Sequence, residues 1–319
     1  MSQLQGKEKL AGGTAVKKGF KYNIARNKTA YLLMLPAMLV VFFMSYLPYM
    51  GIILAFKDYD ILKGIWGSPW VGLANFKEVF TQPNMLLGIW NSLIYGLVIL
   101  FGGMPFPVML ALLFNEIRGT HFKKIVQTVS YMPHFLSWVM VISMFTSMFA
   151  LEGTFNSIMK VIVGESYEPV NILYDSRNFL PIIFITHLWK SVGWSSVVFL
   201  AAIAGIDPTL YEAATVDGCG KFKQVLHITL PCIKGTILTV FIMSLGGLFN
   251  TSFEQVYGFQ NVYIQQQTET INTLIYRTGI QNGKYSLATA FGLAQGIVTV
   301  VIFLLSNFVS KKLFEVSIW

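Results

Sequence analysis

The amino-acid sequence predicts an all-α membrane protein with six transmembrane helices, and two observations carry this prediction. Of the 319 residues, 54% are hydrophobic and only 12% are charged, whereas soluble domains carry about 25% charged residues. In addition, six nearly uncharged runs reach the length of roughly 20 residues that a helix needs to cross a bilayer. These runs are 31–56, 87–114, 125–150, 180–204, 229–251 and 286–310.

The charge distribution predicts how the chain is oriented. Residues 1–28 form a basic tail, and residues 29–319 are expected to form one transmembrane domain. The first apolar run is longer than the core of a signal peptide, so it is expected to remain as the first span. Basic residues gather in the tail and in alternate connections, at 118–124, 221–223 and 311–312. The positive-inside rule therefore places both termini and the segment 205–231 in the cytoplasm, and it accounts for the basic residues without nucleic acid as a partner.

The segment 205–231 interrupts two apolar runs and predicts two short helices. Asp207 and Pro208 together are typical of a helix start, because the carboxylate caps free N–H groups and proline loses no hydrogen bond at the first helical position. Leu210, Ala213 and Ala214 fall on one helical face. Gly218 then permits a turn before a second short helix begins. Helices this short need something to pack against, so a docking partner is expected here.

A polar stripe is predicted on the fourth span, where such side chains are costly and usually face an interior cavity. It consists of His187, Lys190, Ser191, Trp194 and Ser195, at spacings of three and four. One interpretation is the lining of a translocation path, with Trp194 offering a ring on which a sugar can stack. The other is hydrogen bonding between helices, with Lys190 reaching outward.

Weaker candidates for the same path follow on other spans. Asn250 and Glu254, near the outer end of the fifth span, are interpreted as ligand contacts. His134 and Trp138 share a face of the third span, where Pro133 is expected to kink the helix. A single histidine in this setting is more often hydrogen-bonded packing than a ligand.

Nothing in the sequence supports catalysis or metal binding. It contains no HExxH motif, no GxSxG motif and no phosphate-binding glycine-rich loop, and its four histidines are scattered. Cys219 and Cys232 lack the spacing of a metal site and are interpreted as reduced packing residues. An intramembrane hydrolase is the remaining enzymatic alternative, but no nucleophile and base can be placed on one face.

The segment 205–231 resembles the EAA loop of permease subunits of bacterial ATP-binding-cassette importers. The residues that carry the resemblance are Glu212-Ala213-Ala214, Asp217-Gly218 and Ile228-Thr229-Leu230-Pro231. Cys219 departs from the family pattern, where another small residue is common. Further motifs resemble the branch that takes up complex sugars and polysaccharide fragments: Leu47-Pro48, Val71-Gly72-Leu73, the run from Tyr131 to Trp138, and the terminal Glu315-Val316-Ser317-Ile318-Trp319.

The resemblance implies the type I importer permease fold and a non-catalytic role in the bacterial cell membrane. The implied partners are a second permease in a heterodimer, two ATPase subunits that hold ATP and Mg, and an extracellular solute-binding lipoprotein. This chain itself is expected to bind no cofactor. ATP binding is expected to draw the EAA loops together and to rock the permease pair from inward-open to outward-open.

The family pattern also implies roles for individual residues of the loop. Glu212 is expected to contact a basic ATPase residue, and Ala213 and Ala214 are expected to form the close-packed face. Gly218 is expected to be the hinge-like turn. Asp217 and Phe222 are assigned to the same coupling surface.

Two other transport functions are open at this point. An importer of the same type for a peptide or an amino acid would share the EAA loop but lack the aromatic, amide-rich outer segments. An ion-coupled secondary transporter would need no ATPase. Intramembrane acids suited to proton or sodium coupling are nearly absent, with Glu254 as the main candidate.

Overall fold

The computed structural model describes residues 27–164 and 166–314, with side chains through residue 312. It divides into two units, one on each side of the bond between Ile52 and Ile53, and each is described by itself. The predicted basic tail lies almost entirely outside the described residues. The terminal motif from Glu315 to Trp319 also lies outside them.

The first unit is helical from Lys28 onward. It contains α2 (Lys28–Val41), η1 (Phe42–Tyr46) and the beginning of η2 (Leu47–Phe56), which continues past the boundary between the units. Together these elements form a stretch of 29 residues that is long and apolar enough to cross a membrane. The predicted first span is therefore helical.

Six such stretches occur in the described part of the chain, which confirms the predicted all-α membrane architecture. They are Lys28–Phe56, Pro83–Glu116, Trp138–Val163, Ser176–Ala204, Lys221–Leu245 and Tyr285–Lys312. Four of them agree closely with the predicted runs, whereas the third and the fifth differ.

The third apolar stretch begins later than predicted. The predicted run 125–150 covers α7 (Thr120–Tyr131), η4 (Met132–Phe135) and α8 (Trp138–Phe149), followed by α9 (Thr154–Val163). Because α7 carries two lysines and several polar side chains, the stretch that qualifies is Trp138–Val163. Pro133 lies within η4, so the chain breaks here and restarts at Ser137, whose hydroxyl caps α8.

The fifth span ends earlier than predicted. Helix α13 (Leu230–Leu245) follows the π turn η7 (Val225–Thr229) and stops before Gly246 and Gly247. The predicted continuation to residue 251 is wrong, because residues 246–252 form no regular helix. Two adjacent glycines disfavour a helix interior, since each loses more backbone entropy than any other residue.

The other elements of the second unit connect and complete these spans. They are α3 (Gly64–Gly67), α4 (Ala74–Thr81), α5 (Pro83–Leu97), η3 (Val98–Gly102), α6 (Pro105–Glu116), η5 (Ile172–Tyr174), η6 (Ser176–Asn178), α10 (Phe179–Ala204), α11 (Pro208–Val216), α12 (Lys221–Gln224), α14 (Phe253–Phe259), α15 (Gln265–Thr268), α16 (Ile271–Tyr276), η8 (Arg277–Gln281) and α17 (Tyr285–Phe314).

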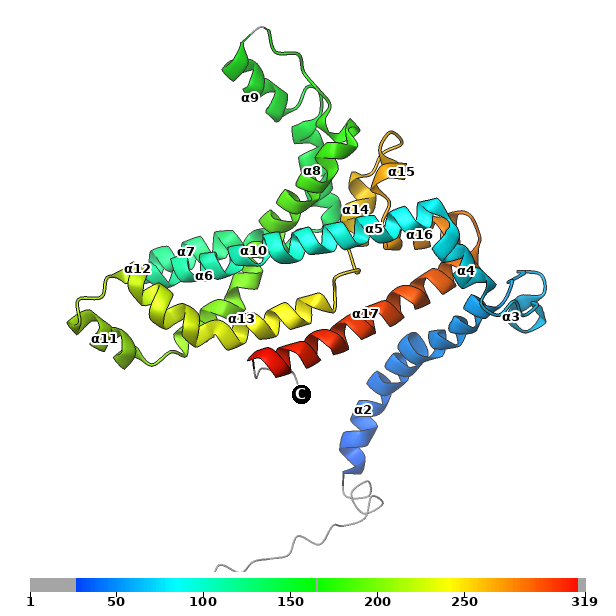
Figure 1. Cartoon of the computed structure of the whole chain (residues 1–319), viewed down its shortest axis with the longest axis horizontal. Helices are drawn as coiled ribbons and strands as arrows, with labels where there is room; N and C mark the ends of the chain where they lie inside the picture. The colour runs from blue at the N-terminus through cyan, green and yellow to red at the C-terminus, as the bar shows by residue number, and fades with distance from the viewer. Residues whose placement is uncertain (1–26, 165, 315–319) are drawn as a thin grey trace, which may run out of the picture. The chain divides into compact units, whose positions relative to one another are not determined.

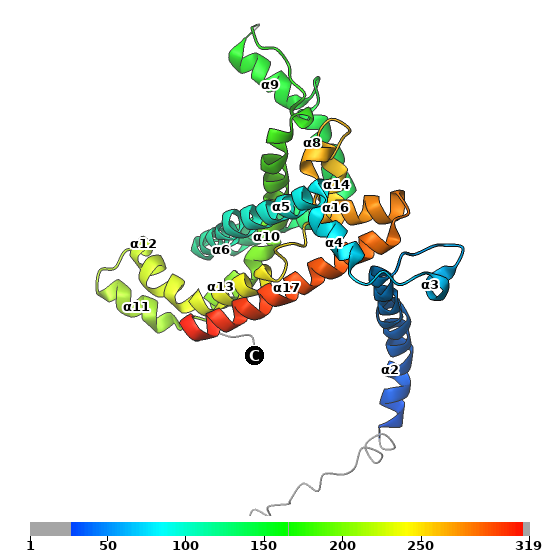
Figure 2. The same ribbon diagram turned by 45° about the vertical axis from the view of Figure 1, so that its right-hand side comes forward.

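Helix α10 is the centre of the second unit. It packs against α6, α7, α13 and α14, while α13 lies beside α17. The helices α11 and α12 lie at one end of this unit, and α4 and α16 lie at the opposite end (Figures 1 and 2). The two ends therefore present different surfaces, one made by the segment 205–231 and the other by α4 and α16.

Close packing of α10 depends on one glycine. A Cβ added at Gly193 would lie 1.9 Å from the carbonyl oxygen of Ser130 in α7. Real Cβ atoms do not approach backbone oxygens so closely, so only glycine permits this crossing. Apolar clusters then fill the space around α10, with Ile183 and Phe199 among the most deeply buried side chains.

Candidate functional site

A cavity of about 580 Å³ opens within the second unit. Its walls come from α5 through α6, from α10 and α13, from the irregular segment 246–252, and from α14 and α16. The polar side chains that line it are His187, Ser191, Ser195, Ser244, Asn250, Thr251, Ser252, Glu254 and Asn272. This volume falls in the range typical of small-molecule sites.

Helix α10 contributes one face to the cavity. His187, Ser191 and Ser195 follow at intervals of four residues and all line it. The Ser191 hydroxyl donates to the carbonyl oxygen of His187 at 2.6 Å. Nδ1 of His187 is buried and has no hydrogen-bond partner among the residues that the structure describes. A buried polar atom at a cavity wall is satisfied most simply by a ligand or by water.

The irregular segment 246–252 supplies the opposite polar groups. Its backbone is held by amides from other elements: Asn272 in α16 donates to the carbonyl oxygen of Thr251 at 2.6 Å, and Gln295 in α17 donates to that of Phe249 at 2.9 Å. Non-helical backbone at membrane depth is tolerated where protein buries it or where it lines a cavity. The break after α13 therefore exposes side chains that a continuous helix would have turned elsewhere.

Four polar side chains converge at this break. Asn272 also donates to Oδ1 of Asn250 at 3.3 Å. Ser252 caps α14 and places Glu254 in the first turn of that helix, where its Oε2 accepts from the Ser252 hydroxyl at 3.4 Å. Asn250 and Glu254, both predicted ligand contacts, thus lie together at the cavity.

The predicted stripe on α10 divides between two environments. Nζ of Lys190 donates to the carbonyl oxygen of His134 at 2.6 Å and lies 5.4 Å from the ring centroid of Trp138. The Trp194 ring stacks on that of His134. Neither Lys190 nor Trp194 is among the residues that line the cavity. They face the break between α7 and α8, because a helix turns by about 100° per residue and the two sets occupy adjacent faces.

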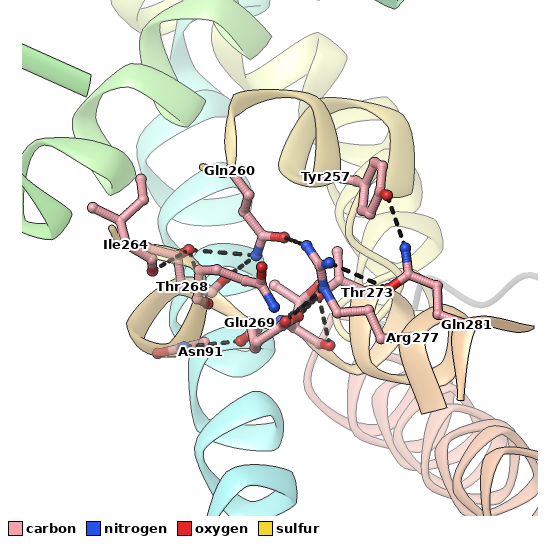
Figure 3. Close-up of polar contacts among 11 residues, drawn as sticks. Asn91, Tyr257, Gln260, Ile264, Thr268, Glu269, Thr273, Arg277 and Gln281 are labelled. Atoms are coloured by element: carbon pink, nitrogen blue, oxygen red, sulfur yellow. Dashed lines mark hydrogen bonds and ion pairs between the residues drawn. The ribbon is translucent and has the colours of Figure 1, made fainter. Parts of the chain in front are cut away.

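A second polar cluster braces the connections of α14 to α16. Figure 3 shows Arg277 between Glu269 on one side and Gln260 and Tyr257 on the other. Nε of Arg277 lies 2.7 Å from Oε1 of Glu269, and its Nη2 donates to Oε1 of Gln260 at 3.0 Å. Asn91 in α5 donates to the carbonyl oxygen of Glu269 at 2.9 Å. These contacts tie the polar loop to α5.

The segment 205–231 forms the two short helices that were predicted, α11 and α12. The Asp207 carboxylate accepts from the backbone N–H of Thr209 at 3.0 Å, and Pro208 is the first residue of α11. Hydrogen bonds from Thr209 lower the pKa of Asp207 below its usual value. Gly218 has φ +74°, a left-handed conformation that favours glycine.

Much of the side-chain surface of this segment is exposed. Glu212, Ala213 and Asp217 are exposed, and so are the apolar side chains of Val216 and Phe222, at 88% and 79%. An exposed apolar surface on two short helices is typical of an interaction site.

A brace within the segment was not predicted from the sequence. Gln224 is buried, and its Nε2 donates to the Thr215 hydroxyl at 3.0 Å and to the carbonyl oxygen of Cys219 at 3.1 Å. The Tyr211 hydroxyl lies 2.9 Å from that of Thr229. Lys221 forms an exposed ion pair with Glu116 at 3.6 Å. No spacing rule signals these pairs, because they join residues across a turn or, for Lys221 and Glu116, in two distant helices.

The polar cavity, the six apolar spans of the described chain and the exposed segment 205–231 agree with one protein family. The family described as binding-protein-dependent transport system inner membrane component matches residues 103–315, more than half of the chain. The chain belongs to this family. The predicted importer permease fold is confirmed as well, by the solved structure described below.

This transport component has similar relatives along nearly its whole length. It is 38% identical over 290 residues to Protein LplB of Bacillus subtilis, covering 91% of this chain and 90% of the relative. It is 38% identical over 296 residues to YteP of the same organism, a polygalacturonan/rhamnogalacturonan transport system permease protein, covering 93% and 92%.

A solved structure matches the fold of this transport component with a TM-score of 0.85 and 31% identity. It is a bacterial alginate ABC transporter in complex with a periplasmic protein that binds an alginate pentasaccharide, and the match covers 94% of this chain and 100% of the other. Because the relatives are permease proteins, the chain is a non-catalytic transport subunit and an integral membrane protein, as predicted.

Proposed function

We propose that the chain is the permease subunit of an ATP-driven importer that moves an oligosaccharide or polysaccharide fragment into a bacterial cell. The polysaccharide cargo of YteP and of the alginate transporter supports a carbohydrate substrate. The chain works with a second permease, two ATPase subunits that bind ATP and Mg, and an extracellular solute-binding protein. It binds no cofactor of its own.

The observation that carries this proposal is the convergence of polar groups on one cavity. His187 and Ser191 on α10 face the same space as Asn250 and Glu254 beyond the end of α13. Hydroxyl, amide, imidazole and carboxylate groups are suited to the hydroxyls of a sugar, because each offers a donor or an acceptor. The substrate path therefore runs along these residues, and Lys190, Trp194 and Trp138 support the adjacent helix break.

Coupling to ATP hydrolysis is assigned to the segment 205–231. The exposed carboxylate of Glu212 can form an ionic contact with an ATPase surface. The exposed apolar residues of the segment can be buried against the same surface. Closure of two ATPases brings two such segments together and drives alternating access. The positive-inside pattern supports a cytoplasmic position for this segment and for both termini in the bacterial cell membrane.

Reconstitution of the complete importer tests the proposal. Proteoliposomes would contain both permeases, the ATPases and the solute-binding protein, with galacturonan, rhamnogalacturonan and alginate fragments as labelled probes. Uptake is expected when ATP is present on the side of the membrane that carries the ATPases. It is expected to stop when ATP is omitted. Uptake that follows an ion gradient and survives omission of the ATPases contradicts the proposal.

A matched pair of variants tests the cavity itself. Asn250→Ala is expected to lower uptake about ten-fold, because it removes a side-chain amide that is positioned at the cavity. Asn84→Ala is the control, since Asn84 is exposed at the start of α5 and lies outside this cavity. Equal uptake by the two variants contradicts the assignment of the cavity as the substrate path.

A further inference from the structure

The ion pair between Glu269 and Arg277 is far more buried than the other ion pairs of the described residues. The Glu269 side chain is 6% exposed and that of Arg277 is 17% exposed. Removing two charges from water costs free energy that their attraction does not reliably return, so such a pair is weak evidence for stability alone. Its hydrogen bonds to other elements are therefore the better guide to its role.

Arg277 connects the end of α16 to α14. Beyond its contact with Glu269, its guanidinium donates to Gln260, the C-cap of α14, and lies 4.9 Å from the ring centroid of Tyr257. Gln281 donates to the Tyr257 hydroxyl at 3.2 Å. Figure 3 shows these side chains gathered on one side of α14. A planar guanidinium with five donors is suited to such a branched contact, whereas an ammonium is not.

Both helices joined by Arg277 carry cavity residues. Helix α14 starts immediately after Asn250 and Ser252, and it holds Glu254 in its first turn. Helix α16 holds Asn272, which donates to Asn250 and to the backbone of Thr251. The Phe253 ring bridges the two helices as well, with centroids 5.1 Å from Tyr257 and 5.0 Å from Tyr276.

The far side of α16 is also held in place. Thr273 donates to the second carboxylate oxygen of Glu269, and the Ser92 hydroxyl in α5 accepts from the backbone N–H of Ile271 at 2.9 Å. Glu269 is thus fixed relative to α5. Arg277 binds both Glu269 and Gln260 of α14, so α14 is held relative to α5 as well.

We propose that Arg277 is a positioning residue for substrate binding: bound to Glu269 at the start of α16 and to Gln260 at the end of α14, it holds the two helices together and sets the spacing of Asn250, Glu254 and Asn272. This inference rests on the proposed function, because it assigns those three residues to the substrate. Arg277 itself does not line the cavity and does not contact the sugar.

Hydrogen–deuterium exchange of the assembled importer provides a test that needs no sugar. Arg277→Met is expected to increase exchange in residues 253–259 more than in α13, because α14 loses its link to Glu269. The matched control is Arg177→Met, since Arg177 pairs with Asp175 at 2.9 Å but is 88% exposed. Unchanged exchange in 253–259 overturns the proposal.

Uptake kinetics separate positioning from a purely structural role. For a galacturonan, rhamnogalacturonan or alginate fragment that the unaltered importer transports, Arg277→Met is expected to raise the half-saturating concentration about ten-fold. Arg277→Lys is expected to give an intermediate half-saturating concentration, because lysine keeps the positive charge but loses the planar guanidinium that contacts several partners at once. A purely structural residue would change the amount of assembled importer and leave the half-saturating concentration unchanged, which overturns the proposal.

The outcomes for this inference and for the proposed function are distinguishable. If the unaltered importer transports none of the carbohydrates, the proposed function fails, and the positioning role then depends on the exchange result alone. If Arg277→Met prevents assembly, Arg277→Lys is measured by the same two methods. Unaltered exchange in 253–259 together with an unaltered half-saturating concentration for that variant overturns the inference.

Discussion

The imidazole of His134 lies parallel to the indole of Trp194, with ring centroids 4.9 Å apart and 6° between the planes. Phe135 adds an edge contact to the same indole, with centroids 5.7 Å apart. One turn earlier on α10, Lys190 donates to the carbonyl oxygen of His134. In the break between α7 and α8, the ring and the carbonyl group of His134 are thus both contacted by side chains of α10.

Trp194→Ala is expected to destabilise the importer without changing its affinity for sugar. Loss of the ring pair removes about 0.5–1.5 kcal/mol in addition to the buried apolar area. Thermal unfolding of the purified complex in detergent measures this effect, and uptake by the assembled fraction measures affinity. A large loss of sugar affinity at unchanged unfolding temperature would restore Trp194 to the substrate path.

Gly193→Ala is expected to lower the stability of the protein strongly, although it adds only one methyl group. The added methyl group meets the Ser130 carbonyl oxygen at 1.9 Å, and relief requires a backbone shift that costs about 1–3 kcal/mol or more. Gly235→Ala is the control, since nothing lies within 4 Å of the added atom in α13. Expression and thermal stability of the two variants give the comparison, and equal stability would show that α10 and α7 do not cross this closely.

Gly218→Val is expected to uncouple uptake from the ATPases. Its φ of +74° strains any residue with a β-branched side chain, at a cost of roughly 1–3 kcal/mol. The expected result is reduced co-purification of the ATPases or reduced uptake per ATP hydrolysed. Gly220→Ala is the control, because Gly220 has φ −69° and open space around it. Normal coupling in Gly218→Val argues against a role for the turn.

Glu212→Ala is expected to weaken the contact with the ATPases while leaving the permease folded. The side chain is exposed and forms no hydrogen bond or ion pair with the described residues, so its removal disturbs no partner among them. Co-purification of the ATPases over a range of salt concentrations measures the effect, since an ionic contact weakens as salt rises. Glu152→Ala, an exposed glutamate beyond α8, is expected to behave like the unaltered protein. Normal uptake and normal co-purification in Glu212→Ala contradict the docking role.

The sequence by itself determined that the chain has six apolar spans, with the bounds of four of them, as well as the absence of recognisable catalytic motifs and the helix start at Asp207. These features depend on residues that are adjacent or regularly spaced in the chain. An apolar run of about 20 residues suits a bilayer whatever its neighbours are. Asp207 bonds to a backbone group two residues away, and a left-handed turn needs a glycine at Gly218. Local chemistry was sufficient for each of them.

Tertiary structure decided which polar groups share a space. Helical spacing alone grouped His187 with Lys190. In the structure, Lys190 instead donates to the carbonyl oxygen of His134, which the break at Pro133 leaves free. The end of α13 at Leu245, which brings Asn250 toward Asn272, depends on amides supplied by α16 and α17. These contacts join residues that are 21 to 56 positions apart in the chain. Sequence periodicity reports the face of one helix, whereas a cavity requires the relative positions of several.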